Sequence, residues 1–179
     1  MLSGGLWREA YDRYALKANR QGTFLATFRA MTNKYPQIHP TAILGDLVAG
    51  TPGEEGKWFA AAKSAGLLAE AAELATTSPC DPKTLTRAAR DFAASKPEFA
   101  RSVGLAALQW LLCGYGYDLT AQDVVDAFNH TLDAARHNGS QADTVRRIQL
   151  LVDQHPGADL TIIALLRRRL DEMTKSSAS

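Results

Sequence analysis

Helix start and stop signals recur along the whole chain, and they constrain its fold more than any other feature of the sequence. Serine, threonine or aspartate precedes a proline or a later acidic residue where a helix can begin, which is the pattern of N-terminal caps and capping boxes. These start signals stand at residues 51–54, 81–82, 95–98, 120–123 and 140–143. Stop signals stand at Gly66, Gly114 and the pair Asn138-Gly139, where a left-handed residue can end a helix.

The segments between these signals predict an all-α fold of about ten helices. Apolar residues recur at helical spacing, alanine is abundant, and no run of β-branched or aromatic residues alternates with polar ones. We expect helices at residues 5–20, 23–34, 40–49, 52–64, 67–77, 82–94, 97–113, 121–137, 141–154 and 159–174.

The helices group into pairs whose length matches a helical repeat. Pairs are expected at residues 5–36, 52–79, 82–114 and 120–155, followed by a terminal helix at 159–174. Such pairs cannot bury their apolar faces alone, so stacking them buries a continuous core. The sequence therefore predicts one domain over residues 1–174, built as an irregular α-solenoid or bundle, with a frayed tail at 175–179. The helix at 40–49 belongs to none of these pairs, so the repeat is irregular.

The first pair resembles a degenerate tetratricopeptide repeat. Trp7, Tyr14, Phe28, Ala30 and Pro36 stand near the positions of that motif. Weaker echoes follow at Gly66, Ala71 and Pro79, in a pair about one helical turn shorter. The resemblance covers about a third of the chain and implies a protein-binding scaffold. Another irregular helical bundle is the alternative, because these residue types also pack ordinary helices.

Composition limits the classes of function. Hydrophobic residues form 46 % of the 179 residues, which is enough for a core, and the formal net charge is only +1. Two distant cysteines exclude a disulfide framework and favour a reducing, cytoplasmic location. The N-terminal residues lack the pattern of a secretory signal, and no apolar run is long enough to span a membrane.

One polar stripe has residue types that bind metals. Asp126, His130, Asp133 and His137 are spaced so that they share one face of a helix. That face lies roughly 160° from the apolar face of the same helix, so we expect it to point into solvent. A metal site is the remote alternative, and the sequence predicts neither a metal nor another cofactor.

The two cysteines are the candidate catalytic nucleophiles of this sequence. Cys80 and Cys113 could serve if a histidine approached either of them in space. Neither lies in a recognisable catalytic motif. Cys113 ends the apolar run that includes Leu108, Trp110 and Leu111, so both thiols are expected to be buried and inert. No catalytic residue is predicted.

Basic residues concentrate near the N-terminus. Residues 1–40 carry six basic and two acidic side chains, with aromatic residues between them. This pattern makes nucleic acid a candidate ligand. The expected contacts are Arg13, Lys17 and Arg20 in this segment, together with Arg168 in the terminal helix. A solvated basic face is the simpler interpretation, because the aromatic residues repeat at the spacing of a helix core.

The terminal helix has an unusually wide apolar surface. Its apolar residues span an arc of about 220° on a helical wheel. Burial inside the chain is one explanation, and a docking surface that includes Leu166, Leu170 and Met173 is the other.

These features together favour a non-enzymatic module that binds a peptide or helix of another protein. The expected partner is a separate protein, the rest of a longer polypeptide or a second copy of the chain. Nucleic-acid binding through the basic first pair is the alternative, and a metal-dependent enzyme is a remote one. No membrane partner is expected.

Overall fold

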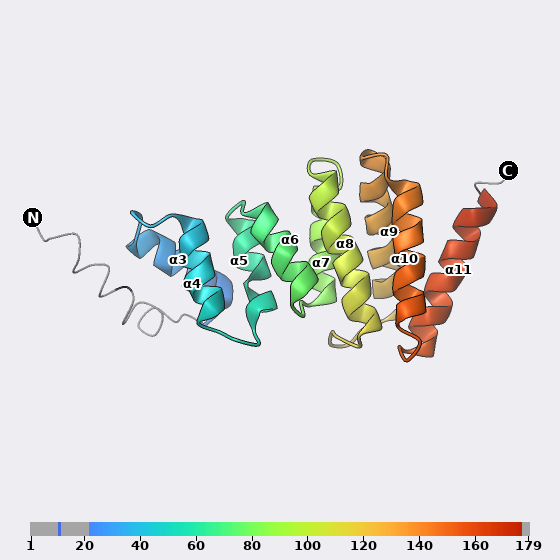
Figure 1. Cartoon of the computed structure of the whole chain (residues 1–179), viewed down its shortest axis with the longest axis horizontal. Coiled ribbons are helices and arrows are strands. Elements are labelled where there is room, and N and C mark those ends of the chain that lie inside the picture. The colour runs from blue at the N-terminus through green and yellow to red at the C-terminus, as the bar shows by residue number, and fades with distance from the viewer. Residues whose placement is uncertain (1–10, 12–21, 177–179) are drawn as a thin grey trace, which may run out of the picture. The chain divides into compact units, whose positions relative to one another are not determined.

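The computed structural model describes Tyr11 and residues 22–176, and every element in that part of the chain is a helix (Figure 1). The fold is all-α, as the sequence predicted, with nine α-helices and one 3-10 helix among the described residues. In chain order the elements are α3 (Phe24–Lys34), α4 (Pro40–Ala49), η2 (Glu55–Trp58), α5 (Phe59–Ser64), α6 (Leu68–Thr77), α7 (Pro82–Phe92), α8 (Pro97–Leu112), α9 (Ala121–His137), α10 (Gln141–Gln154) and α11 (Leu160–Ser176). None of these helices is both long enough and apolar enough to cross a membrane.

Eight helices begin and end within two residues of the predicted bounds. The Asp81 side chain accepts from the Thr84 amide at 2.9 Å and caps α7, while Thr120 and Asp123 form the predicted capping box of α9. Gly66, Gly114 and Gly139 all have a positive φ angle, as expected for residues that end helices. The predicted helix at 5–20 lies outside the described residues except for Tyr11.

Three of the predicted side-chain caps do not form, although Ser140 does stand at the N-cap position of α10. Thr51 does not begin a helix, because its hydroxyl donates to the Leu47 carbonyl and accepts from the Trp58 indole at 2.7 Å. The chain turns at 51–53, and the helical segment starts at η2. Lys96 rather than Ser95 precedes α8, and neither it nor Ser140 before α10 makes a side-chain cap. The predicted frayed tail also begins too early, since α11 continues to Ser176.

The contacts divide the chain into two compact units, residues 1–74 and 75–179, where the sequence predicted one domain. In the first unit, α3, α4, η2 and α5 pack on one another. Met31, Ile43 and Phe59 are fully or almost fully buried there. Tyr11 belongs to this unit as well, since its hydroxyl donates to Asp46 at 2.7 Å.

The second unit is built on α7, α8 and α9, which all contact one another. The predicted pairs 82–114 and 120–155 correspond to α7 with α8 and α9 with α10, and the helices of each pair are in contact. Gly104 of α8 lies so close to α9 that a Cβ atom there would be 3.0 Å from the Cβ of Thr131. The glycine therefore allows the close approach of these two helices. Trp110 of α8 donates from its indole to the Ala75 carbonyl at 2.7 Å.

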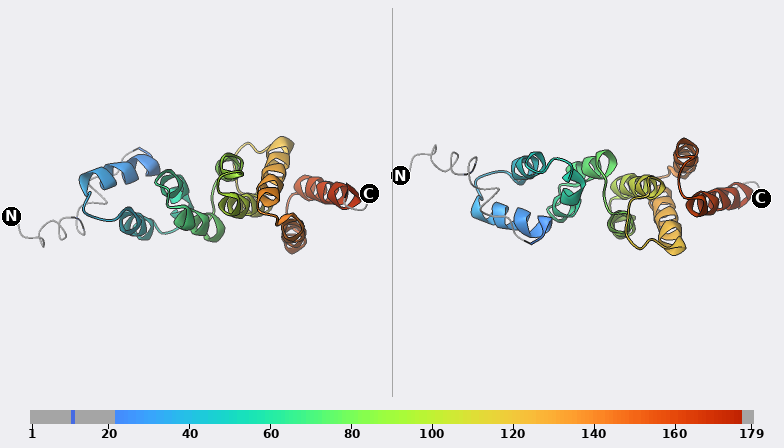
Figure 2. Two further views of the ribbon diagram at one scale, coloured as in Figure 1. Left: turned by 90° about the horizontal axis from the view of Figure 1, so that it is seen from above. Right: turned by 90° about the horizontal axis from the view of Figure 1, so that it is seen from below.

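Helices α8 and α10 of this unit run parallel and in register. Arg101 of α8 contacts Asp143 of α10, and Cys113 contacts His155, so both pairs are 42 residues apart. Figure 2 looks roughly along the axes of α8 and α10. The twelve residues between the two contacts correspond to about 18 Å of helix. The two helices therefore lie side by side over about three turns.

The terminal helix α11 packs on α9 and α10. Leu166 and Leu170 are 0 % and 3 % exposed, and Met173 is half-buried. Burial inside the chain thus explains most of the apolar arc of this helix. The expectation that Leu166 and Leu170 form a docking surface is corrected, because α9 and α10 already cover this side of α11.

Candidate functional site

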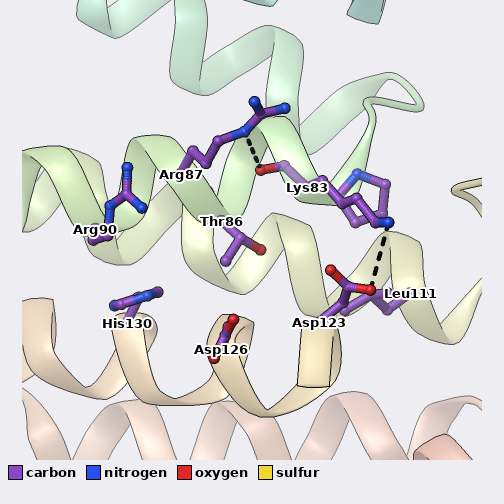
Figure 3. Close-up of a pocket in the computed structure, with 9 residues that line it drawn as sticks. Lys83, Thr86, Arg87, Arg90, Leu111, Asp123, Asp126 and His130 are labelled. Carbon is purple, nitrogen blue, oxygen red and sulfur yellow. Dashed lines mark hydrogen bonds and ion pairs between the residues drawn. The ribbon is translucent and has the colours of Figure 1, made fainter. Parts of the chain in front are cut away.

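Two grooves cross the surface of the second unit, and they differ in chemistry. The first lies between α7 and α9 and has a volume of about 290 Å³. Figure 3 shows one wall on α7 and the other on α9, with Leu111 of α8 also lining the space. The residues from the two main walls are Pro82, Lys83, Thr86, Arg87, Arg90, Asp123, Asp126 and His130.

The charged groups of this α7–α9 groove are mostly paired within the chain. The Lys83 amine lies 3.5 Å from the Asp123 carboxylate (Figure 3). It also donates to the Asp118 carbonyl at 2.8 Å. Asp126 accepts from Gln122, and Arg90 donates to Asp91. Since both signs of charge are present and largely satisfied, the groove offers no strong preference for an anion or a cation.

The predicted polar stripe of α9 is therefore only partly in solvent. Asp126, His130 and Asp133 are half-buried, and only His137 is exposed. The helical wheel of α9 predicted that this face points into solvent. The prediction was incomplete because Asp126 and His130 face α7 across the groove, and the pattern of one helix does not show which helix packs beside it. Within the described part of the chain, no group of three or more histidine, cysteine or acidic side chains converges on a point where a metal could bind.

The second groove, which we call the α8–α10 trough, follows the parallel helices α8 and α10. Its volume is about 460 Å³. The lining residues are Arg101, Ser102, Leu105, Ala106 and Gln109 from α8, Arg147, Leu150, Leu151 and Gln154 from α10, and Thr76 from α6.

Apolar side chains occupy the middle of the trough. Leu150 is 57 % exposed, while Leu105 and Leu151 are half-buried. Most other leucines of the second unit are buried, so an open leucine next to two partly open ones forms a small apolar patch. Gln109 and Gln154 add hydrogen-bonding groups along the same surface.

The N-terminal end of the trough carries excess positive charge. Asp143 pairs with Arg101, with Arg147 at 3.3 Å and with Arg146 at 3.8 Å. One carboxylate therefore faces three guanidinium groups, and no second acidic side chain lies within ion-pair distance of any of the three among the described residues. Arg101 is held in place by a further hydrogen bond of 2.6 Å to Thr144. This end of the trough attracts negative charge.

The thiol and imidazole at the other end contradict one sequence prediction. Cys80 is buried as expected, but Cys113 is exposed. Its sulfur lies 3.5 Å from the Nε2 atom of His155. The apolar run before Cys113 indicated burial, but α8 ends at Leu112 and the chain turns away at Gly114.

The residues predicted to contact nucleic acid do not form a described site. Arg13, Lys17 and Arg20 lie outside the described residues. Arg168 is exposed on α11, and its Nε atom donates to Glu172 at 3.1 Å.

Sequence reasoning missed the trough entirely. Its walls come from segments separated by 42 residues, and neither Arg101 nor Leu150 belongs to a local motif. The only signal in the sequence was the pair of adjacent leucines, Leu150 and Leu151. Neighbouring residues in a helix point in different directions, so one of the two must lie toward the edge of the buried face. No protein-family model matches the chain, and comparisons with curated proteins and with solved structures found no match.

Proposed function

We propose that this chain is a protein-interaction module whose α8–α10 trough binds a segment of another protein. The observation that carries this proposal is the open Leu150 beside Leu105 and Leu151, in a trough with excess arginine at one end. Burial of these leucines by a partner removes apolar surface from water, at about 25 cal/mol for each Å².

The chemistry of the trough suggests the kind of segment it binds. An apolar side chain fits between Leu105, Leu150 and Leu151, and a carboxylate fits the end where Arg101 and Arg147 share Asp143. The distance between the two ends, about 18 Å, matches three turns of a partner helix. A short amphipathic helix with acidic residues near one end satisfies both requirements.

The test is selection of peptides on the folded protein, with two leucine variants to locate the binding surface. A phage-displayed library of peptides about twelve residues long covers helices of the required length. Selected peptides are then synthesised with a fluorescent label, and their affinities are measured by fluorescence anisotropy. Leu150→Asp places a charge in the trough, whereas Leu160→Asp changes a leucine on α11 that is 79 % exposed and does not line the trough.

We expect the selected peptides to combine acidic and apolar residues, and their affinity to fall at least about tenfold with Leu150→Asp, which corresponds to about 1.4 kcal/mol. Leu160→Asp should leave the affinity unchanged. Equal binding by both variants, or a library that yields no binder sensitive to Leu150, would overturn the proposal.

A further inference from the structure

Cys113 and His155 form a contact that the trough does not require. Cys113 is the residue that follows α8, and His155 is the residue that follows α10. Because the two helices are parallel and in register, their C-terminal ends lie next to each other. The sulfur and the imidazole Nε2 atom are 3.5 Å apart, which is within hydrogen-bond distance for a thiol. The thiol is exposed and therefore accessible to reagents in solution.

The hydrogen bond of the other imidazole nitrogen, Nδ1, determines the tautomer of His155. Nδ1 of His155 lies 2.7 Å from the Leu151 carbonyl oxygen. A carbonyl oxygen only accepts hydrogen bonds, so Nδ1 carries the proton. In the neutral ring, Nε2 then presents its lone pair to the Cys113 thiol. A nucleophile, a base and a third group that orients the base are thus present together.

The second cysteine provides an internal control. Cys80 is only 5 % exposed, and its burial, with a smaller contribution from the neighbouring Asp81, raises the pKa of its thiol to about 12. At neutral pH this thiol remains protonated and inaccessible. A thiol reagent should therefore distinguish the two cysteines in the folded protein.

We infer that Cys113 and His155 form a reactive thiol–imidazole pair, a site of covalent modification by small disulfides. In the reaction, the Cys113 thiol gives its proton to Nε2 and the sulfur attacks one sulfur atom of the disulfide. A new sulfur–sulfur bond forms and the original one breaks. The other half of the small disulfide departs as a thiolate, and Nε2 of His155 releases its proton to water. Cys113 is oxidised to a mixed disulfide, and the small disulfide is reduced to one thiolate and the protein-bound half. This inference is independent of peptide binding in the trough.

The probe is an aromatic disulfide, dithionitrobenzoate, whose coloured thiolate product reports the reaction. We expect one thiolate per folded chain, mapped to Cys113 by mass spectrometry, and a second only after denaturation exposes Cys80. Cys80→Ser should leave the rate unchanged, and Cys113→Ser should abolish the reaction of the folded protein.

His155→Ala tests the role of the imidazole. A thiol without a base is only a few per cent ionised at neutral pH, so we expect the rate constant to fall about tenfold. Free imidazole added to the buffer should restore part of the rate in this variant and have little effect on the wild type. A purely structural role of His155 would not produce this rescue.

Continued protection of Cys80 shows that the variant is folded, and His155→Gln replaces His155→Ala if that protection is lost. The inference is overturned if Cys113 and Cys80 react at similar rates in the folded wild-type protein. It is also overturned if a folded His155 variant reacts as fast as the wild type, or if imidazole fails to accelerate that variant.

Discussion

Arg101 on α8 forms an ion pair with Asp143 on α10, although 42 residues separate them in the chain. The Arg101 side chain is only 16 % exposed, and its guanidinium also donates to the Thr144 hydroxyl at 2.6 Å. This contact joins the N-terminal portions of two parallel helices. It also directs the charge of Arg101 toward the trough, so one residue contributes both to stability and to the proposed binding surface.

Replacement of Arg101 by methionine should destabilise the protein. Arg101→Met leaves Asp143 and Thr144 without their shared donor, and hydrogen bonds that involve a charged group contribute about 1.5–3 kcal/mol. We expect a loss of about 2 kcal/mol in the free energy of unfolding, measured with urea. Arg147→Met is the matched control, since Arg147 is 61 % exposed and pairs with the same carboxylate. Its cost should stay below about 1 kcal/mol, and equal costs would show that the partial burial of Arg101 adds nothing.

Substitution of Gly104 should push α8 and α9 apart. The Cβ atom of an alanine there would lie 3.0 Å from the Thr131 Cβ and 3.1 Å from its Cα. Backbone of α9 would have to move, so we expect Gly104→Ala to cost about 1–3 kcal/mol despite the better helix propensity of alanine.

Gly45 of α4 is the control for this substitution, because it is exposed and a Cβ atom there meets nothing within 4 Å. Gly45→Ala should raise the free energy of unfolding by about 0.5–1 kcal/mol through helix propensity alone. Thermal and urea unfolding of both variants measure the difference. Similar stabilisation by the two alanines would mean that the α8–α9 contact can open at no cost.

The capping box of α9 should make stability depend on pH. Partial desolvation acts to raise the pKa of the Asp123 carboxyl, but hydrogen bonds from Thr120 and the charge of Lys83 outweigh it and lower the pKa below its usual value. A lowered pKa in the folded state adds stability above about pH 4, the value of an unfolded aspartate, and this stability disappears as the pH falls through the folded value.

The difference in unfolding free energy between the wild type and Asp123→Asn should therefore be larger at pH 7 than at pH 3. Urea unfolding at the two pH values measures it. Asp171→Asn changes an exposed carboxylate of α11 that makes no hydrogen bond or ion pair with another of the described residues. That variant should stay within about 0.5 kcal/mol of the wild type at pH 7. A pH-independent cost of Asp123→Asn would contradict the role of the charge.

Neutralising one arginine of the trough should lower the affinity of acidic peptides more than that of neutral peptides. Arg147→Gln removes one of the three guanidinium groups around Asp143 and leaves the leucines in place. We expect a loss of about threefold to tenfold in affinity for selected acidic peptides at low salt, and a smaller loss at high salt because of screening.

Arg136→Gln on α9 is the control for charge, since this arginine is 53 % exposed and does not line the trough. It should leave peptide affinity unchanged in the same anisotropy measurement. Identical losses for the two variants would indicate a general effect of net charge instead of a contact in the trough.

Helix positions were predictable because their signals are local. Asp81 caps an amide three residues later, and Thr120 and Asp123 satisfy each other's backbone within one turn. Gly66 and Gly139 end helices through their own backbone angles. Each of these features depends on a few adjacent residues, so no knowledge of the tertiary structure is needed.

Predictions failed where a distant residue competed for the same group. Thr51 had the pattern of a capping box, but its hydroxyl accepts a hydrogen bond from the Trp58 indole instead. Asp143 stands three residues after Ser140, but its carboxylate pairs with Arg101. The local pattern was present in both segments, and the packed structure offered a different partner.

The sequence by itself determined that the chain is helical and where most of its helices begin and end. Only the tertiary structure decided which helices lie in register, and so brought Arg101 to Asp143 and Cys113 to His155. It also decided that Asp126 and His130 face α7 and that Leu166 is buried. The physical reason is the range of the interactions: capping and helix propensity act within one turn, whereas the neighbours of a helix face are chosen by packing among residues far apart in the chain.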